Sequence, residues 1–250
     1  MLSNLFIKDI RIKWEDISER SYLKGIPAIA SIDDLQFEKP ITFFVGENGS
    51  GKSTLLEAIA VAYGFNPEGG TKNYSFSTYD SHSELCDYIR LSRGYVKPRR
   101  GYFLRAESFY NVATKEDEYS KSGGGDDRYI PQEFHLKSHG ESFLQLAQNY
   151  FGPNGIFFLD EPEAALSPQR QLTLLYEMNK CASCGSQFIV VTHSPILLGI
   201  PDADIISFDD GAIHRISYEE TESYLVTKSF VDNRKGMLER LLNDECESER

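Results

Sequence analysis

The sequence predicts an α/β protein in which helices cover a mostly parallel sheet. Short apolar segments of strand length alternate with segments of helical periodicity along most of the 250 residues. An apolar fraction of 40%, with 12% aromatic residues, supplies the material for a core. The length fits one large domain, or a core with one attached lobe.

The expected elements follow in chain order. Residues 5–14 form an opening strand, and residues 40–45 form a buried strand that leads into a glycine-rich turn. A helix is expected over residues 53–63, because its leucine, isoleucine and alanine residues form one apolar stripe. Four later strands, with helices between them, are expected at 102–104, 155–159, 187–191 and 205–208. A short amphipathic helix at 237–242 precedes an acidic tail, whereas the charged, glycine-containing stretch 114–129 is expected to be a mobile loop.

Composition narrows the classes of function. The chain has 26 Lys and Arg against 38 Asp and Glu, a net charge of −12, which argues against a surface that coats nucleic acid as a whole. No apolar run approaches the roughly 18 residues of a membrane-spanning helix, and the first residues do not resemble a signal peptide. We therefore expect a soluble cytoplasmic protein, or one held at a membrane by a partner. Cys181 and Cys184 form a C-x-x-C pair, but the four cysteines favour reduced thiols over a zinc site.

Residues 46–54 have the pattern of a phosphate-binding loop. They fit G-x-x-x-x-G-K-[ST] between a predicted strand and a predicted helix. Glycines let backbone N–H groups turn towards an anion, Lys52 brings positive charge to the β- and γ-phosphates, and the Ser53 hydroxyl can coordinate Mg²⁺. The predicted phosphate-binding residues are Gly46, Glu47, Asn48, Gly49, Ser50, Gly51, Lys52, Ser53 and Thr54.

Two later strands end in residues with matching chemistry. Asp160 and Glu161 follow four apolar residues, so Asp160 is expected to hold Mg²⁺ and Glu161 to orient and polarise the attacking water. His193 follows the next apolar strand, where a neutral imidazole could bond the γ-phosphate and sense its loss. The simpler alternatives are a solvated acidic pair and a structural histidine.

Taken in order, these motifs resemble those of ATP-binding cassette (ABC) ATPases over nearly the whole chain. Residues 46–54 resemble the Walker A loop, 160–162 the Walker B motif with its catalytic glutamate, 164–167 the D-loop, and His193 the switch histidine. The closest resemblance is to the soluble, SMC-like branch and its stand-alone AAA-family ATPases, of which some relatives serve in anti-phage defence or toxin–antitoxin pairs. The resemblance implies a P-loop NTPase head with a mainly parallel central sheet, an N-terminal antiparallel β part and a small helical signature subdomain.

The resemblance also implies a domain plan and a dimer. One domain would span 1–250, with a core lobe at about 1–107 and 153–235, a helical signature lobe at about 108–152, and a C-terminal helix and acidic tail at 236–250. Ser138, Gly140 and Glu141 stand where the family's L-S-G-G-Q signature lies, although His139 and Lys137 depart from it. They would contact the ATP of a head-to-tail partner, while Lys52, Ser53 and Asp160 hold ATP and Mg²⁺ in cis. A polar loop with a helix cap at Ser138 is the alternative.

The family's Q-loop glutamine has no counterpart here, and Glu107 is the nearest candidate metal ligand. Three functions stay open. The first is a soluble ATPase that couples ATP turnover to a partner in nucleic-acid maintenance or anti-phage defence. The second is the nucleotide-binding subunit of a membrane transporter, which the missing glutamine and altered signature disfavour. The third is a non-hydrolysing regulatory switch, which the presence of both Asp160 and Glu161 disfavours.

A basic stretch within residues 90–105 predicts a second kind of contact. It contains no acidic residue, and aromatic residues interleave with its cations, the mixture that phosphate contacts and base stacking require. We therefore expect a sequence-independent contact with DNA or RNA. The alternative is that these cations line the ATP site or pair with acidic residues elsewhere. The cations are Arg90, Arg93, Lys97, Arg99, Arg100 and Arg105, and the aromatic residues are Tyr95, Tyr102 and Phe103.

Overall fold

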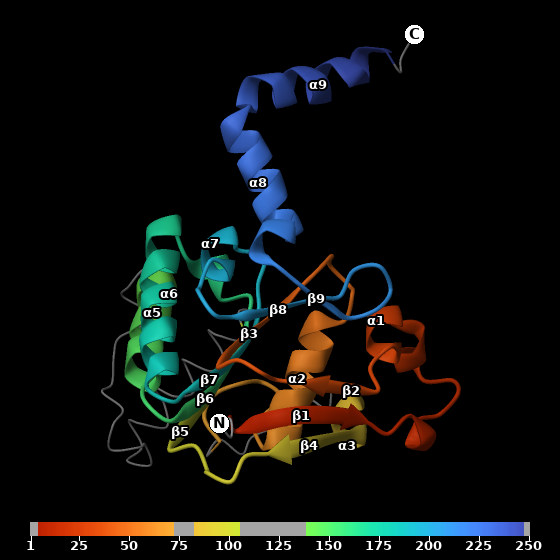
Figure 1. The fold of residues 1–250 in the computed structure, drawn as a ribbon, viewed down its shortest axis with the longest axis vertical. Coiled ribbons are helices and arrows are strands. Elements are labelled where there is room, and N and C mark those ends of the chain that lie inside the picture. Colours follow the sequence, from red (N-terminus) through yellow and green to blue (C-terminus); the bar gives the residue numbers. More distant parts are fainter. Residues whose placement is uncertain (1–4, 73–82, 106–138, 248–250) are drawn as a thin grey trace.

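The computed structural model describes residues 5–72, 83–105 and 139–247. Its centre is a six-stranded sheet with the strand order β5-β6-β7-β3-β8-β9 (Figure 1). The first five of these strands run parallel, and the last pairs antiparallel with its neighbour. The strands are β3 (Ile41–Val45), β5 (Arg100–Arg105), β6 (Gly155–Asp160), β7 (Gln187–Val191), β8 (Asp204–Ser207) and β9 (His214–Ile216). The predicted α/β class with a mainly parallel sheet is confirmed.

Burial on both faces explains why the central strands are apolar throughout. Every residue of β3, β6 and β7 is buried, as a parallel sheet with covered faces requires. Close packing also restricts Gly155 of β6, because a Cβ there would lie 2.5 Å from the Phe157 ring. The predicted strands at 40–45, 102–104, 155–159, 187–191 and 205–208 all lie within or next to these elements.

A second sheet of three antiparallel strands has the order β2-β1-β4 and confirms the predicted N-terminal antiparallel part. Its strands are β1 (Ile7–Ile12), β2 (Asp34–Gln36) and β4 (Ile89–Arg93). The first strand is shorter than the predicted 5–14, because Trp14 already opens a 3₁₀ turn. Buried Gln187 joins the two sheets: its Oε1 accepts the N–H groups of Phe6 and Ile7, and its Nε2 donates to the Ile7 carbonyl, each at 2.9 Å.

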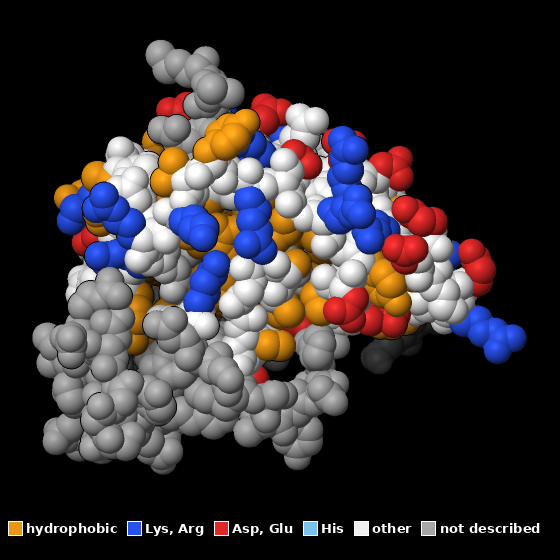
Figure 2. All heavy atoms as spheres, turned by 90° about the horizontal axis from the view of Figure 1, so that it is seen from below, with side chains coloured by type: hydrophobic (Ala, Val, Ile, Leu, Met, Phe, Trp, Pro, Cys, Tyr) orange, Lys and Arg blue, Asp and Glu red, His pale blue; other side chains and the backbone are white. Residues whose placement is uncertain are grey.

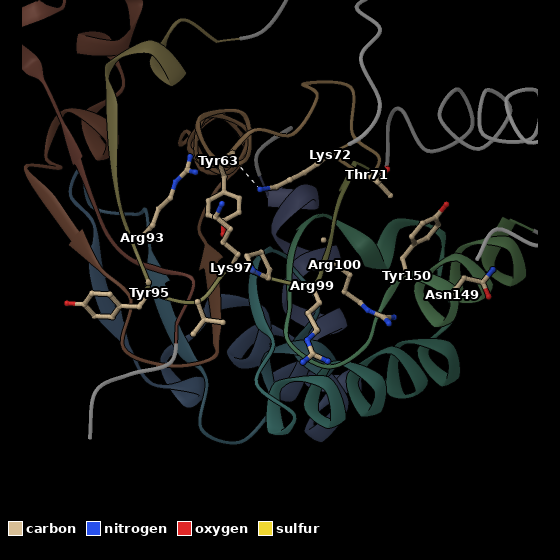
Figure 3. Close-up of a pocket in the computed structure, with 14 residues that line it drawn as sticks. Tyr63, Thr71, Lys72, Arg93, Tyr95, Lys97, Arg99, Arg100, Asn149 and Tyr150 are labelled. Carbon is tan, nitrogen blue, oxygen red and sulfur yellow. Dashed lines mark hydrogen bonds between the residues drawn. The ribbon is translucent and has the colours of Figure 1, made fainter. Parts of the chain in front are cut away.

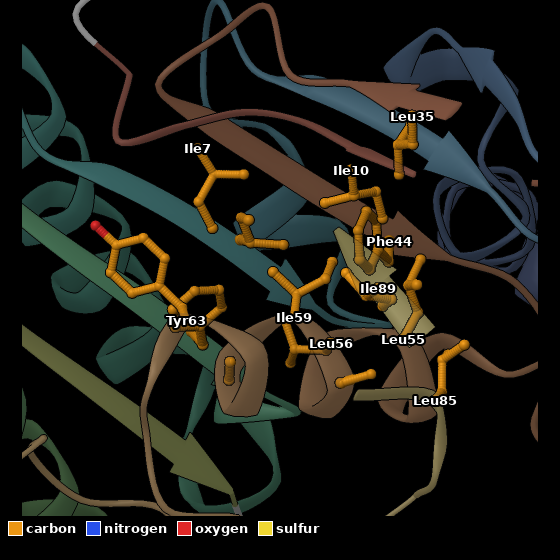
Figure 4. Close-up of a cluster of buried hydrophobic side chains, with 14 of the residues drawn as sticks. Ile7, Ile10, Leu35, Phe44, Leu55, Leu56, Ile59, Tyr63, Leu85 and Ile89 are labelled. Atoms are coloured by element: carbon orange, nitrogen blue, oxygen red, sulfur yellow. The ribbon is translucent and has the colours of Figure 1, made fainter. Parts of the chain in front are cut away.

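Helix α2 (Lys52–Tyr63) lies between the two sheets. Figure 4 shows Leu55, Leu56 and Ile59 of this helix packed among side chains from both sheets. On the other face, α5 (His139–Tyr150) and α6 (Pro168–Ser183) cover aromatic residues of β5, β6 and β7. The shorter helical elements are η1 (Trp14–Asp16), η2 (Tyr22–Gly25), α1 (Pro27–Ala30), α3 (Leu85–Tyr88), η4 (Pro162–Ala165), α7 (Pro195–Leu198) and η5 (Tyr218–Glu220).

The C-terminal helices α8 (Glu222–Asp232) and α9 (Arg234–Glu247) extend away from the sheets as an arm (Figure 1). The short helix predicted at 237–242 is the middle of α9, and α8 was not predicted. No helix in the described part of the chain has the length and apolarity needed to cross a membrane. The stretch 114–129 lies outside the described residues.

Candidate functional site

The loop between β3 and α2 has a backbone that only glycine adopts easily. Gly46, Gly49 and Gly51 have φ values of +135°, +83° and +100°. A Cβ at Gly46 would lie 2.8 Å from Asp209 Oδ1, and one at Gly51 would lie 2.9 Å from the side chains of Ile26 and Ile29. Conformation therefore favours glycine at all three positions, and close neighbours add to this at Gly46 and Gly51.

Lys52 is folded back over this loop. Its side chain is buried, and Nζ donates to the carbonyls of Gly46 at 2.7 Å and Glu47 at 2.6 Å. Burial lowers the pKa of Lys52, an effect that nearby carboxylates oppose, first that of Asp209 and then that of Glu161. The ammonium group is thus held at the mouth of the loop in a carboxylate-rich setting, where an incoming phosphate would find a preset positive charge.

Ser53 and Asp160 meet although 107 positions separate them in the chain: the Ser53 hydroxyl donates to Asp160 Oδ1 at 2.8 Å. Parallel pairing of β6 and β7 sets Asp160 beside Val191, at the edge where the strands' carboxyl ends gather. A hydroxyl and a carboxylate are the hard oxygen donors that Mg²⁺ prefers, and Mg²⁺ usually keeps several water and phosphate ligands besides. This pair fits the predicted Mg²⁺ site.

No other metal site is evident in the described residues, where no group of three His, Cys, Asp or Glu side chains comes together. Cys181 is buried and Cys184 exposed, and both are free thiols. Burial raises the pKa of Cys181, which keeps it protonated. The C-x-x-C pair is therefore not part of a metal cluster among these residues.

Glu161 begins the turn that leaves β6. Its φ of +49° is left-handed, an uncommon conformation outside glycine, and its N–H donates to the Val191 carbonyl at 3.0 Å. Its carboxylate acts on the pKa of Lys52, so the two charged groups face the same site. The strained residue is the one that sequence reasoning assigned to water activation.

His193 follows β7 and is exposed at the same edge. Its N–H donates to Glu163 Oε1 at 2.6 Å, and burial raises the pKa of that carboxyl against the lowering effect of this hydrogen bond. His193 and Gly46 line a cavity of about 380 Å³, together with Asp209. The phosphate loop, the acidic pair and the predicted switch histidine therefore share one edge of the sheet.

Sequence reasoning missed two residues of this edge, Glu163 and Asp209. Asp209 Oδ1 accepts the Glu47 N–H at 2.9 Å and so fixes the start of the loop. The available signal was its position just after an apolar strand that runs parallel to the others. Glu163 had no such signal, since it lies in the 3₁₀ turn η4 and reaches the loop after β7 through its side chain.

Four other predicted site residues are described only in part or not at all. Ser138 and Glu107 lie outside the described residues. Gly140 and Glu141 lie in the first turn of α5, which begins at His139. Their roles in a partner's ATP site stay predictions.

The basic stretch is only partly what the sequence predicted. Arg105 does not belong to a basic surface, because it forms an ion pair with Glu57 of α2 and donates to the Pro67 carbonyl at 3.2 Å. The acidic partner of Arg105 thus lies outside the basic stretch, 48 positions before Arg105 in the chain. Arg90 lies opposite Arg11 in the β1–β4 pairing. The other four cations line a pocket described below.

The fold and site define a P-loop domain of the ABC and SMC-like ATPase class: a mainly parallel sheet, a glycine loop leading into a helix, and an acidic pair two strands away. Residues 22–155, more than half of the chain, match the sequence family described as "AAA domain", and the chain belongs to that family. Residues 121–199 also match an AAA-domain family whose description names the AbiEii toxin and a type IV toxin–antitoxin system. The predicted class is confirmed. No curated protein matches the chain in sequence.

The solved structures that match the chain include the following three. An SMC head domain from Thermotoga maritima is 16% identical, with a TM-score of 0.45, over 85% of this chain and 99% of that chain. A cobalt transport ATP-binding protein is 19% identical, with a TM-score of 0.44, over 75% and 72% of the two chains. A metal-chelate type ABC transporter in an inward-facing conformation is 16% identical, with a TM-score of 0.41, over 77% and 79%.

Proposed function

We propose that the protein binds Mg-ATP and hydrolyses it to ADP and phosphate. The observation that carries this proposal is the contact between Ser53 and Asp160, which brings the phosphate loop and the acidic strand to one point beside Lys52. Backbone N–H groups of residues 46–54 would surround the phosphates, with Lys52 at the β- and γ-phosphates. Mg²⁺, held by Ser53 and Asp160, would neutralise charge on the phosphate oxygens.

Glu161 is the proposed general base. Its carboxylate would orient the water that attacks the γ-phosphorus and would take up a proton from it, while the bond from that phosphorus to the β–γ bridging oxygen breaks. His193 would contact the γ-phosphate and respond to its release. The hydrogen bond from His193 N–H to Glu163 gives the loop after β7 a fixed attachment to the turn that follows Glu161.

The active form we propose is a head-to-tail homodimer. Ser138, Gly140 and Glu141 of one copy would complete the ATP site of the other, since a hydroxyl and backbone N–H groups at a helix start suit an anion. Loss of the γ-phosphate charge would then weaken the dimer and open it. ATP turnover would thereby drive motion in a partner.

We place this cycle in the cytoplasm, in nucleic-acid maintenance or anti-phage defence. The support is the second family's description, which names a toxin and a toxin–antitoxin system. Two alternatives remain: a nucleotide-binding subunit of a transporter whose membrane segments lie on another chain, and a switch that binds ATP without hydrolysing it. The presence of Glu161 next to Asp160 favours turnover over the switch.

The test compares the wild type with Glu161→Gln, using Glu19→Gln as a control that removes one carboxylate from a 92% exposed side chain. We expect Glu161→Gln to bind Mg-ATP within about threefold of the wild type and to lose about 10²–10⁴-fold in turnover, the range for a general base. Glu19→Gln should match the wild type. Turnover by Glu161→Gln at the wild-type rate would refute the assigned role. Tight ATP binding by a wild type without turnover would establish the switch instead.

A further inference from the structure

A second pocket lies at the edge of the sheet opposite the phosphate loop. Its volume is about 570 Å³, and it is lined by the end of α2, the segment from β4 into β5, and the end of α5. Helix α2 begins at Lys52 in the phosphate loop and ends at Tyr63 in this pocket. Its 12 residues separate the two sites by about 18 Å, at 1.5 Å per residue. The pocket is therefore distinct from the proposed ATP site.

Positive charge is concentrated in this pocket. Figure 2 shows Lys and Arg side chains gathered around a hollow of hydrophobic side chains. None of the described lining residues is Asp or Glu, although the whole chain carries a net charge of −12. A concave site lined by charges of one sign focuses the field and attracts an oppositely charged ligand. The lining cations are Lys72, Arg93, Lys97, Arg99 and Arg100.

Aromatic side chains lie beside these cations. The Lys72 ammonium lies 3.8 Å from the centre of the Tyr63 ring, and the Arg93 guanidinium lies 4.7 Å from it (Figure 3). Tyr150 also lines the pocket, and Tyr95 stands at its edge with 92% of its surface exposed. A ligand that carries both an anion and a flat ring would satisfy both kinds of group, by charge pairing and by stacking.

Among the residues that the structure describes, two cations of the pocket have no anionic partner, although Lys72 donates to the Tyr63 carbonyl at 3.2 Å. Burial and the neighbouring charge of Arg93 lower the pKa of Lys72 to about 8, so a positive charge there is costly without an anion. Arg100 donates through Nη1 to the Phe151 carbonyl at 3.3 Å, but its buried Nε–H has no acceptor in the described part of the chain. A buried donor without a partner costs about 1–3 kcal/mol. An anion in the pocket would offset the cost at Lys72.

We propose that this pocket binds one nucleotide unit with a terminal phosphate: the phosphate contacts Lys72 and Arg93, which both lie over the Tyr63 ring, and the base stacks on a tyrosine. The volume suits a single nucleotide and excludes a duplex, whose grooved surface would need a convex protein element to enter it. The unit comes either from a free nucleoside monophosphate or from the 5′-phosphorylated end of a single strand. The proposal is independent of ATP hydrolysis, because the two sites share no described lining residue.

The experiment uses the full chain with saturating Mg-ATP, so that the first site is filled, and measures binding by calorimetry. The probes are thymidine monophosphate, five-residue oligothymidylate with a 5′-phosphate, and the same strand with a 5′-hydroxyl. We expect the phosphorylated strand to bind at least about tenfold tighter than the hydroxyl strand. Lys72→Ala with Arg93→Ala should weaken binding by at least about tenfold. The matched control, Arg11→Ala with Arg90→Ala, removes two cations from β1 and β4 outside the pocket and should not weaken it.

The outcomes distinguish the sources and the alternatives. Tighter binding of the monophosphate than of the phosphorylated strand identifies a free nucleotide as the source, and tighter binding of the phosphorylated strand identifies a strand end. Equal binding of both strands would overturn the terminal-phosphate site in favour of a general single-strand groove. Binding that inorganic phosphate or anionic lipid vesicles displace equally well, or no binding at all, would also overturn it. ATP turnover and the unfolding midpoint of each variant verify that the chain is folded.

Discussion

Replacing Gln187 by leucine should destabilise the protein more than its single side chain suggests. Gln187 is 1% exposed and bonds three main-chain groups at the start of the first strand, the N–H groups of Phe6 and Ile7 and the Ile7 carbonyl. Leucine is similar in size but offers no hydrogen bond, so three buried polar groups lose their partners. Each such group costs about 1–3 kcal/mol, and water that reaches the strand end recovers part of the total. We expect a loss of about 3–5 kcal/mol in the free energy of unfolding, or about 10 °C in Tm.

Gln171→Leu is the matched control for this change. Gln171 also uses both ends of its amide, because it accepts from the Ser194 hydroxyl at 2.6 Å and donates to the Leu166 carbonyl at 3.0 Å. It is only half-buried, so water replaces its bonds and about 1 kcal/mol should be lost. Urea unfolding followed by circular dichroism measures both variants. Equal losses for Gln187→Leu and Gln171→Leu would refute the claim that Gln187 joins the two sheets energetically.

Three further predictions concern the site. Lys52→Ala should weaken Mg-ATP binding at least about tenfold in calorimetry, since the phosphates lose a charged partner in the loop; unchanged affinity would contradict this. Glu161→Gln should sediment as a dimer with saturating ATP and as a monomer without it, and a monomer under both conditions would exclude the head-to-tail dimer. Burial raises the pKa of Glu163 above its usual value of 4.5 in the folded protein, so folding disfavours the ionised carboxylate. The free energy of unfolding therefore falls as the pH rises from 4.5 through the pKa of the folded state. Glu163→Gln should therefore gain stability relative to the wild type between pH 4 and pH 7, and a difference that does not change with pH would disprove the assignment.

The central strands could be predicted because burial on both faces restricts which residues they can contain. A parallel strand with both faces covered must be apolar throughout, and β3, β6 and β7 have this signature. The phosphate loop was equally predictable, because glycine is needed where φ is positive. By contrast, β4 has one buried residue in five and carries two arginines, so its sequence resembles a surface loop.

Contacts between distant segments could not be predicted. Arg105 belongs to an acid-free stretch in sequence, yet in the fold it pairs with Glu57 of a helix. Lys72 and Tyr63 lie outside that stretch and still line the basic pocket. Such assignments depend on which strand neighbours which, and periodicity carries no information about strand order.

The strand order has a consequence for how the chain folds. β7 lies between β3 and β6, so Ser53 and Asp160 can approach each other only after residues 187–191 have inserted between their strands. A nascent chain that has left the ribosome as far as residue 170 would possess both motifs and still lack the site. Insertion of a central parallel strand closes long loops and is intrinsically slow. The protein should therefore gain affinity for nucleotide late in refolding. Added Mg-ATP should slow unfolding, because it binds only chains whose central strand is in place.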